Sequence, residues 1–323
     1  MEIFTPDYYN AFACLASACP DSCCKEWEVD VDAAAAAYYR SLHGALGDRL
    51  RQVLRDTEDG ASMTITEGRC PMWRQDGLCQ IQAELGHDAL CQTCRDYPRL
   101  RHDYGTFAEL GLELSCPEAA RLLLSCDQTG AEVPTPTYDP DLSVLLRTRA
   151  ELLKFWEDSP LPLPQKLAAT LLYGYDVQEE LDGGTKAELT ADFAEIQKQL
   201  HREDAAKLFD FFRSLEILTD RWQTLLSAPV PAVWHPELRN LAIYGIRRYW
   251  LQAANDLDVV CRAKLVCAMC LLVAHLNGSP LQTAQLMSKE IENDPDNVEA
   301  ILDGAYTAPA LTDAYLLSLL LKN

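Results

Sequence analysis

The chain has 323 residues, of which 48% are hydrophobic and 24% are charged. These values are typical of a globular protein with one large or two medium domains, and they exclude a largely disordered chain. The formal net charge is −21, because 28 basic residues stand against 49 acidic ones. An acidic surface repels phosphate groups, so we expect neither nucleic acid nor a membrane as a partner. A cationic, lysine-bearing protein is compatible with this charge.

The first ten residues, MEIFTPDYYN, contain no basic segment followed by an apolar one. We therefore expect no secretory signal and a cytoplasmic location. The longest strongly apolar run, residues 265–274, is too short to span a bilayer and predicts a buried helix.

The N-terminal sequence predicts short helices and loops around clustered cysteines. Ala, Leu and Arg at helical spacing predict a helix over residues 32–55. Alternation of apolar residues with Thr predicts a short strand over residues 61–67. A turn signal at Asp76-Gly77 precedes residues 80–90, which we expect to form a short helix.

Prolines mark a boundary in the middle of the chain. Residues 128–140 contain three prolines and few apolar side chains, which is typical of a linker. We therefore divide the chain into a cysteine-rich domain over residues 1–127, expected to bind metal and to carry the catalytic site, and a second domain over residues 141–323.

The second domain is expected to be α-helical. Apolar residues recur three and four positions apart, as in the stripe from Leu208 to Leu225. Similar patterns cover residues 141–157, 164–181, 188–200, 237–254, 257–276 and 309–321. The predicted fold class is mainly α: a metal-binding N-terminal domain of short helices and loops, followed by an α-helical C-terminal domain.

Thirteen cysteines are unevenly distributed, with ten in the first 126 residues. An odd count without an export signal argues against disulfides and favours a metal. Cys19, Cys23 and Cys24 fall within six residues, so their thiols can converge on one centre. By contrast, Cys267 and Cys270 sit in the apolar run and are expected to pack as small hydrophobic residues, whereas Cys126 fits either interpretation.

The spacing favours an iron–sulfur cluster over zinc. Zinc sites usually consist of two regular CxxC-like knuckles, whereas clusters accept less regular cysteine spacing. The six histidines are scattered without an HxxxH or HExxH pattern, which argues against a His-based catalytic zinc site. Zinc on the cysteines remains the alternative.

Several nucleotide-binding and catalytic motifs are missing from the sequence. No GxG occurs, so the dinucleotide, P-loop and glycine-rich methyltransferase loops are excluded. A GxSxG elbow and the CxxxCxxC motif of radical S-adenosylmethionine enzymes are also absent.

Five ordered segments resemble the flagellin lysine-N-methylase (FliB) family. The first, Cys19 to Trp27, is similar to its CxxxCCxxW opening, and Ser115 to Arg121 spells its SCPEAAR signature. Between them, Cys70-Pro-Met, Gly77-Leu-Cys79-Gln-Ile81 and Thr93-Cys94-Arg95-Asp-Tyr97-Pro98-Arg99 resemble its intervening motifs. Together the segments cover about residues 8–124.

The resemblance implies methyl transfer from S-adenosylmethionine to lysine ε-amines of flagellin, together with a 4Fe–4S cluster. Seven candidate metal ligands follow from the motif positions, more than the four that one cluster takes. Cys14 and Cys91 are weaker candidates. The seven are Cys19, Cys23, Cys24, Cys70, Cys79, Cys94 and Cys116.

The implied chemistry suggests further site residues. A lysine amine must lose its proton before it attacks a sulfonium methyl, and Tyr97, Glu113 or Glu118 could accept that proton. Arg95, Arg99 and Arg101 could bind the carboxylate of the cofactor. Structural ion pairs or a helix cap explain these residues equally simply. The alternative function is a non-catalytic metal-binding or redox-sensing protein.

Overall fold

The computed structural model describes residues 1–58, 60–126 and 138–322. Helices dominate this part of the chain, and two small three-stranded sheets lie in its N-terminal portion. The expected mainly α fold class is confirmed. Most of the predicted linker, residues 128–137, lies outside the described residues, and the division into domains stays a prediction.

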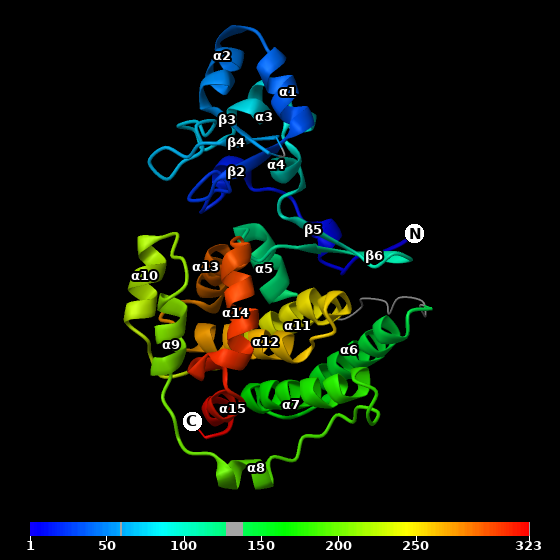
Figure 1. Cartoon of the computed structure of the whole chain (residues 1–323). Coiled ribbons are helices and arrows are strands. Elements are labelled where there is room, and N and C mark those ends of the chain that lie inside the picture. The colour runs from blue at the N-terminus through cyan, green and yellow to red at the C-terminus, as the bar shows by residue number, and fades with distance from the viewer. Residues whose placement is uncertain (59, 127–137, 323) are drawn as a thin grey trace.

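A small lobe, residues 29–96, lies at the top of Figure 1. Its antiparallel sheet has the strand order β2-β4-β3, with Val29 opposite Met63. The side chains of Tyr39, Leu50 and Met72 lie at the centre of a core that belongs to this lobe. Its elements are β2 (Val29–Asp32), α1 (Ala33–Ser41), α2 (Gly44–Val53), β3 (Leu54–Thr57), β4 (Gly60–Met63), α3 (Gln80–Leu85), the 3₁₀ turn η3 (His87–Ala89) and α4 (Gln92–Asp96).

A second sheet joins the small lobe to the rest of the molecule. Its strand order is β1-β6-β5, with β1 parallel to β6 and β5 antiparallel to it. Phe107 and Leu112 of this sheet belong to the core of the helices below. The strands are β1 (Glu2–Phe4), β5 (Arg99–Asp103) and β6 (Phe107–Leu112); the 3₁₀ turns η1 (Tyr9–Ala11) and η2 (Ala16–Ala18) follow β1, and α5 (Pro117–Ser125) follows β6.

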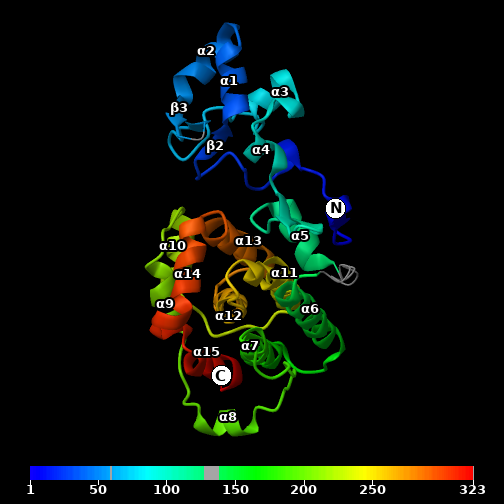
Figure 2. The same ribbon diagram turned by 45° about the vertical axis from the view of Figure 1, so that its right-hand side comes forward.

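The described residues from 138 onward form a helical body, in the lower part of Figures 1 and 2. None of the described helices is long and apolar enough to cross a membrane. The helices of the body are α6 (Pro140–Asp158), α7 (Leu163–Leu181), α8 (Ala194–Gln199), α9 (Ala206–Arg213), α10 (Asp220–Ser227), α11 (Leu238–Tyr249), η4 (Trp250–Asn255), α12 (Val260–Ala274), α13 (Pro280–Ile291), α14 (Pro295–Thr307), η5 (Pro309–Leu311) and α15 (Asp313–Leu321).

Helix α12 is the centre of the body, and every one of its residues is buried. It packs against α7, α11, α13, α14 and α15, which surround it. A helix that is apolar on all sides has no solvent face to present, so burial from every direction is its stable environment. Cys267 and Cys270 lie within this core, in agreement with their predicted packing role.

The predicted N-terminal elements exist but are shorter than expected. Residues 32–55 form two helices rather than one, because the chain turns at Gly44 with φ +81°, a conformation that glycine adopts without strain. The strand predicted over residues 61–67 is β4, which ends at Met63. The helix predicted over residues 80–90 stops at Leu85, because Gly86 adopts φ +88° and a 3₁₀ turn follows.

Two further differences occur in the body. Of residues 188–200, only Ala194–Gln199 are helical, and the stripe from Leu208 to Leu225 is divided between α9 and α10. Helices α13 and α14 have no counterpart among the predicted elements, although α13 contributes directly to the site described below.

The central position of α12 leads to a stability prediction. Leu271→Ala is expected to lower the free energy of unfolding by about 2–5 kcal/mol, because Leu271 is completely buried and the cavity cannot fully collapse. Val233→Ala, at a half-exposed side chain outside the helices, should change it by less than about 0.5 kcal/mol. Chemical denaturation followed by circular dichroism measures both, and equal losses would contradict this account of the core.

Candidate functional site

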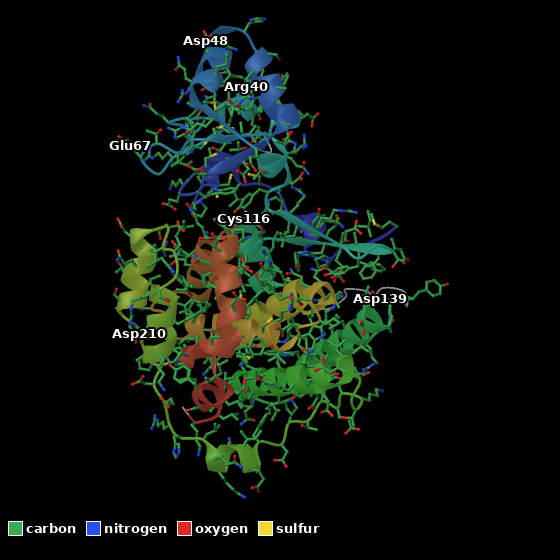
Figure 3. All side chains as sticks on the ribbon, in the orientation of Figure 1. Arg40, Asp48, Glu67, Cys116, Asp139 and Asp210 are labelled. Carbon is green, nitrogen blue, oxygen red and sulfur yellow. The ribbon has the colours of Figure 1, made fainter. Side chains whose placement is uncertain are left out.

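A cavity of about 420 Å³ lies where the small lobe meets the helical body. This volume is within the range of small-molecule sites in proteins. Its walls come from the segments around Cys19–Trp27, from α3 and α4, from Tyr97–Arg99, from Ser115–Glu118, and from Lys289 and Asn293 of the body. Figure 3 shows Cys116 at this junction. We call the cavity the junction pocket.

Backbone hydrogen bonds bring two separate cysteine-bearing turns together beside the pocket. The amide of Cys70 donates to the carbonyl of Cys24 at 2.8 Å, and Lys25 forms a β-bridge with Arg69. A second bridge pairs Trp73 with Cys79. These bonds place residues nearly fifty positions apart in direct contact, which the sequence alone does not determine.

The thiol of Cys24 is the centre of the resulting cluster. It interacts with the thiols of Cys23, Cys70 and Cys79. These interactions raise the pKa of Cys24 and lower the pKa values of Cys23, Cys70 and Cys79. For Cys79 the value falls to about 6, although burial opposes the change. A lowered pKa favours the thiolate, the form that binds metals.

Cys91 and Cys94 form a second thiol pair at the start of α4. The hydrogen bond between them lowers the pKa of Cys91 and raises that of Cys94. Asp32 fixes this helix to the sheet: one carboxylate oxygen accepts from the amide of Gln92 at 2.9 Å, and the other caps α1 through Ala35. Cys94 reaches the junction pocket.

Cys19 and Cys116 line the other side of the pocket together with Cys14. Cys116 is the N-cap of α5, and burial raises the pKa of its thiol to about 11. Six of the seven predicted metal-binding cysteines thus line one pocket, and the seventh, Cys70, is joined to them through its backbone bond with Cys24. All seven are free thiols.

The donor set fits a thiolate-bound metal in its chemistry and number. Cys23, Cys24, Cys70 and Cys79 supply the four thiols that an iron–sulfur cluster takes, and three of them have lowered pKa values. Within the described residues, however, no three His, Cys, Asp or Glu side chains are arranged as an ion would need them. Metal binding at these thiols would thus require them to rearrange.

Two of the three predicted proton acceptors lie at the junction pocket. Tyr97 lines it, and its hydroxyl is 3.1 Å from the hydroxyl of Ser115. Burial raises the pKa of Tyr97 well above its usual range, so the phenol stays protonated. Glu118 also lines the pocket, but Arg121 hydrogen-bonds both of its oxygens and lowers its pKa.

Glu113 lies behind the pocket rather than in it. Its carboxylate is 3.8 Å from the guanidinium of Arg248, and burial raises its pKa. Among the described residues, Glu113 is therefore placed as part of a buried charge network in the helical body, not as a pocket-lining group.

The three predicted arginines also differ in whether they line the pocket. Arg99 lines the pocket, with its guanidinium 5.2 Å from the centre of the Phe12 ring. Arg95 is half-exposed beside Asp96, and Arg101 pairs with Asp103 at 3.3 Å on the strand surface. Only Arg99 of the three lines the described pocket.

Sequence reasoning did not assign several residues that shape the pocket. Trp27 stands 6.0 Å from Tyr97, centre to centre, and donates from its indole nitrogen to the carbonyl of Cys23. Its place in the CxxxCCxxW motif was the available signal. Lys289 of α13 also lines the pocket, although it lies more than 260 residues after its partner Asp21 in the chain. No sequence motif includes it.

Comparisons with known proteins agree with the motifs. The chain is 26% identical over 250 residues to lysine-N-methylases of Salmonella typhimurium strain LT2 and Salmonella choleraesuis strain SC-B67, covering 75% of this chain and 57% of each of those proteins. It is 30% identical over 132 residues to the flagellar biosynthetic protein FliU of Salmonella muenchen, covering 39% of this chain and 78% of FliU. No family model and no solved structure matches the chain.

The fold and site define a mainly α protein in which a cysteine-rich lobe covers a ligand-sized pocket. The chain spans little more than half the length of the two lysine-N-methylases it matches. Its match to FliU covers more than two thirds of that protein. The chain belongs to the flagellin lysine-N-methylase (FliB) family, as its motifs suggested.

The thiol cluster leads to a pH prediction for the metal-free protein. Alkylation of Cys79 by iodoacetamide should level off by about pH 7, because the thiolate is the reactive form and its pKa is about 6. Alkylation of Cys116 should still rise at about pH 9, because its pKa is about 11.

Removing the Cys24 thiol tests the cause of this difference. Cys24→Ala should raise the pKa of Cys79 and slow its alkylation at pH 7 by at least about tenfold. Cys270→Ala, in the core of α12, is the matched control and should leave the profile unchanged. Peptide mass spectrometry gives the rate for each cysteine, and a parallel pH profile for Cys79 and Cys116 would contradict the cluster.

Proposed function

We propose that the protein methylates lysine side chains of a protein, flagellin, with S-adenosylmethionine as the methyl donor. The observation that carries the proposal is the composition of the junction pocket: thiols, the aromatic pair Trp27 and Tyr97, and Arg99 line one cavity of cofactor size. The relatives named lysine-N-methylase and flagellar biosynthetic protein support the reaction and the substrate.

The proposal assigns an iron–sulfur cluster to Cys23, Cys24, Cys70 and Cys79, with zinc as the alternative metal. S-adenosylmethionine, when bound, supplies an electrophilic methyl group on a sulfonium. A cluster would cross-link the separate chain segments that carry Cys23 and Cys24, Cys70, and Cys79. Free thiols throughout the set are consistent with a reducing, cytoplasmic environment.

The chain's own residues would bind and orient the two reactants. Trp27 and Tyr97 offer aromatic faces, which attract a sulfonium as they attract other cations. Arg99 offers a guanidinium for the carboxylate of the methionine portion. Tyr97 stays protonated, so it would act as a hydrogen-bond donor and not as a base.

Glu118 would act on the incoming lysine. Its lowered pKa keeps it ionised, and its position on the pocket wall lets it attract an ammonium group. A lysine amine has an ordinary pKa near 10.4, so it must give up a proton before methyl transfer. Desolvation in the pocket lowers the pKa of the amine, so that Glu118 could accept its proton and leave the neutral amine as the nucleophile.

The direct test is methylation of flagellin from the same organism by anaerobically purified protein. Iron, zinc and acid-labile sulfide are measured in the same preparation, together with S-adenosylmethionine binding by calorimetry. We expect matched iron and sulfide, cofactor binding, and stepwise methyl additions on flagellin by mass spectrometry. Cys79→Ala should lower metal content by more than about tenfold, and Cys270→Ala should not.

Metal without cofactor affinity or methyl transfer would reject the enzymatic proposal. It would favour a metal-binding or redox-sensing role. Stoichiometric zinc without sulfide would reject the cluster alone, and methyl transfer could still occur.

Arg99 has a natural control two residues away. Arg99→Met should weaken S-adenosylmethionine binding by about tenfold or more, because a charge-assisted hydrogen bond contributes about 1.5–3 kcal/mol. Arg101→Met removes an arginine from the same strand that pairs with Asp103 outside the pocket. Calorimetry should show unchanged binding for Arg101→Met, and equal losses in both variants would exclude a specific role for Arg99.

A further inference from the structure

Helix α13 of the helical body contacts both cysteine-bearing walls of the junction pocket. In Figures 1 and 2 it lies beside α5, directly below the small lobe. Gln285 and Lys289 are one helical turn apart on the same face of α13, and both are buried. Buried polar side chains at i and i+4 need partners, and these two find theirs in the N-terminal part of the chain.

Lys289 is the stronger of the two contacts. Its ammonium lies 2.9 Å from a carboxylate oxygen of Asp21 and 2.7 Å from one of Glu26. Only 5% of its side chain is exposed, whereas those of Asp21 and Glu26 are 25% and 33% exposed. The two acidic residues flank Cys23 and Cys24, so one buried cation holds both ends of that segment.

The backbone of the segment from Asp21 to Glu26 has an unfavourable conformation that the ion pairs stabilise. Glu26 adopts φ +70°, a left-handed conformation that residues other than glycine rarely take. Its amide donates to the carbonyl of Gly68 at 3.0 Å, which places the turn beside Cys70. The ion pair with Lys289 favours this conformation over the relaxed alternatives.

Gln285 connects the same segment to the opposite wall. Its amide nitrogen donates to the carbonyl of Ser115 at 2.7 Å and lies 3.4 Å from Asp21. Ser115 precedes Cys116, and its hydroxyl contacts that of Tyr97. One side chain of α13 therefore sets the separation between the Cys19–Cys24 wall and the Cys116 wall.

We infer that Lys289 and Gln285 are positioning residues: α13 holds the cysteine-bearing segments of the junction pocket in the arrangement that binds metal and cofactor. This assigns a role to the helical body in the site. The inference rests on the proposed function for the purpose of this arrangement. The contacts themselves do not depend on that function.

The test uses the full-length protein and the reactivity of its cysteines. Lys289→Met keeps the aliphatic packing and removes the charge. In metal-free protein, alkylation of the partly buried Cys19 and Cys24 should accelerate on the order of tenfold or more, because loss of charge-assisted hydrogen bonds shifts local opening by that factor. Cys267 and Cys270 should stay protected. Iron bound after reconstitution, read from its visible absorbance, should fall, and Lys289→Arg should restore much of it.

Lys264→Met is the matched control. Lys264 is as buried as Lys289, with 4% of its side chain exposed, and pairs with Asp313 at 2.9 Å in the helical body. It does not line the described pocket. The control should leave the alkylation of Cys19 and Cys24 and the bound iron unchanged.

Should Lys289→Met fail to fold, Asp21→Asn breaks the same contact from the partly exposed side and should accelerate the same alkylations. Unchanged alkylation and iron in the folded variants would overturn the inference, and so would an equal effect of Lys264→Met. Faster alkylation in a protein whose wild type neither binds S-adenosylmethionine nor methylates flagellin would reject the proposed function and retain the positioning role.

Discussion

Three buried cations of the helical body hold the N-terminal part of the chain in place. Arg149 of α6 forms a bidentate pair with Glu109 of β6, Arg248 of α11 lies between Glu113 and Glu292, and Lys289 of α13 joins Asp21 and Glu26. Breaking a buried pair by removing one partner typically costs about 3–5 kcal/mol, because the other charge is left without compensation. In a chain with 28 basic and 49 acidic residues, these three cations lie where acidic residues of the N-terminal part meet the helical body.

The helical core was predictable because its signal is apolar. Residues 265–274 form an uninterrupted hydrophobic run, and α12 is buried on every side. Helix α13 escaped prediction for the opposite reason. Its buried face includes Gln285, Lys289 and Glu290, whose burial is made possible by partners that are distant in sequence. A hydrophobicity pattern treats such residues as solvent-facing, so a helix that buries charge has a weak periodic signal.

The site was predictable at the level of motifs and not at the level of single residues. Four of the five segments that resemble the family line one pocket, and the backbone bond from Cys70 to Cys24 joins the fifth to them. Within one segment, however, residues of the same type can lie in different places, one in the pocket and another on the surface. Arg99 and Arg101 share a strand face, but two residues move a side chain by about 6–7 Å along a strand, and that distance separates the pocket from the surface.

The two carboxylates near Ser115-Cys116 differ in pKa because their surroundings differ. Glu118 at the start of α5 is ionised by its pair with Arg121, whereas burial behind the pocket raises the pKa of Glu113. Groups of the same type that are driven apart in pKa can perform different tasks in one protein. In the reaction proposed above, the ionised Glu118 would attract an incoming ammonium, and the neutral Tyr97 would offer it a hydroxyl oxygen that accepts a hydrogen bond. Such an arrangement suits a reaction in which a cationic side chain must arrive charged and react neutral, because the carboxylate that attracts the ammonium could also take its proton once desolvation has lowered the pKa of the amine.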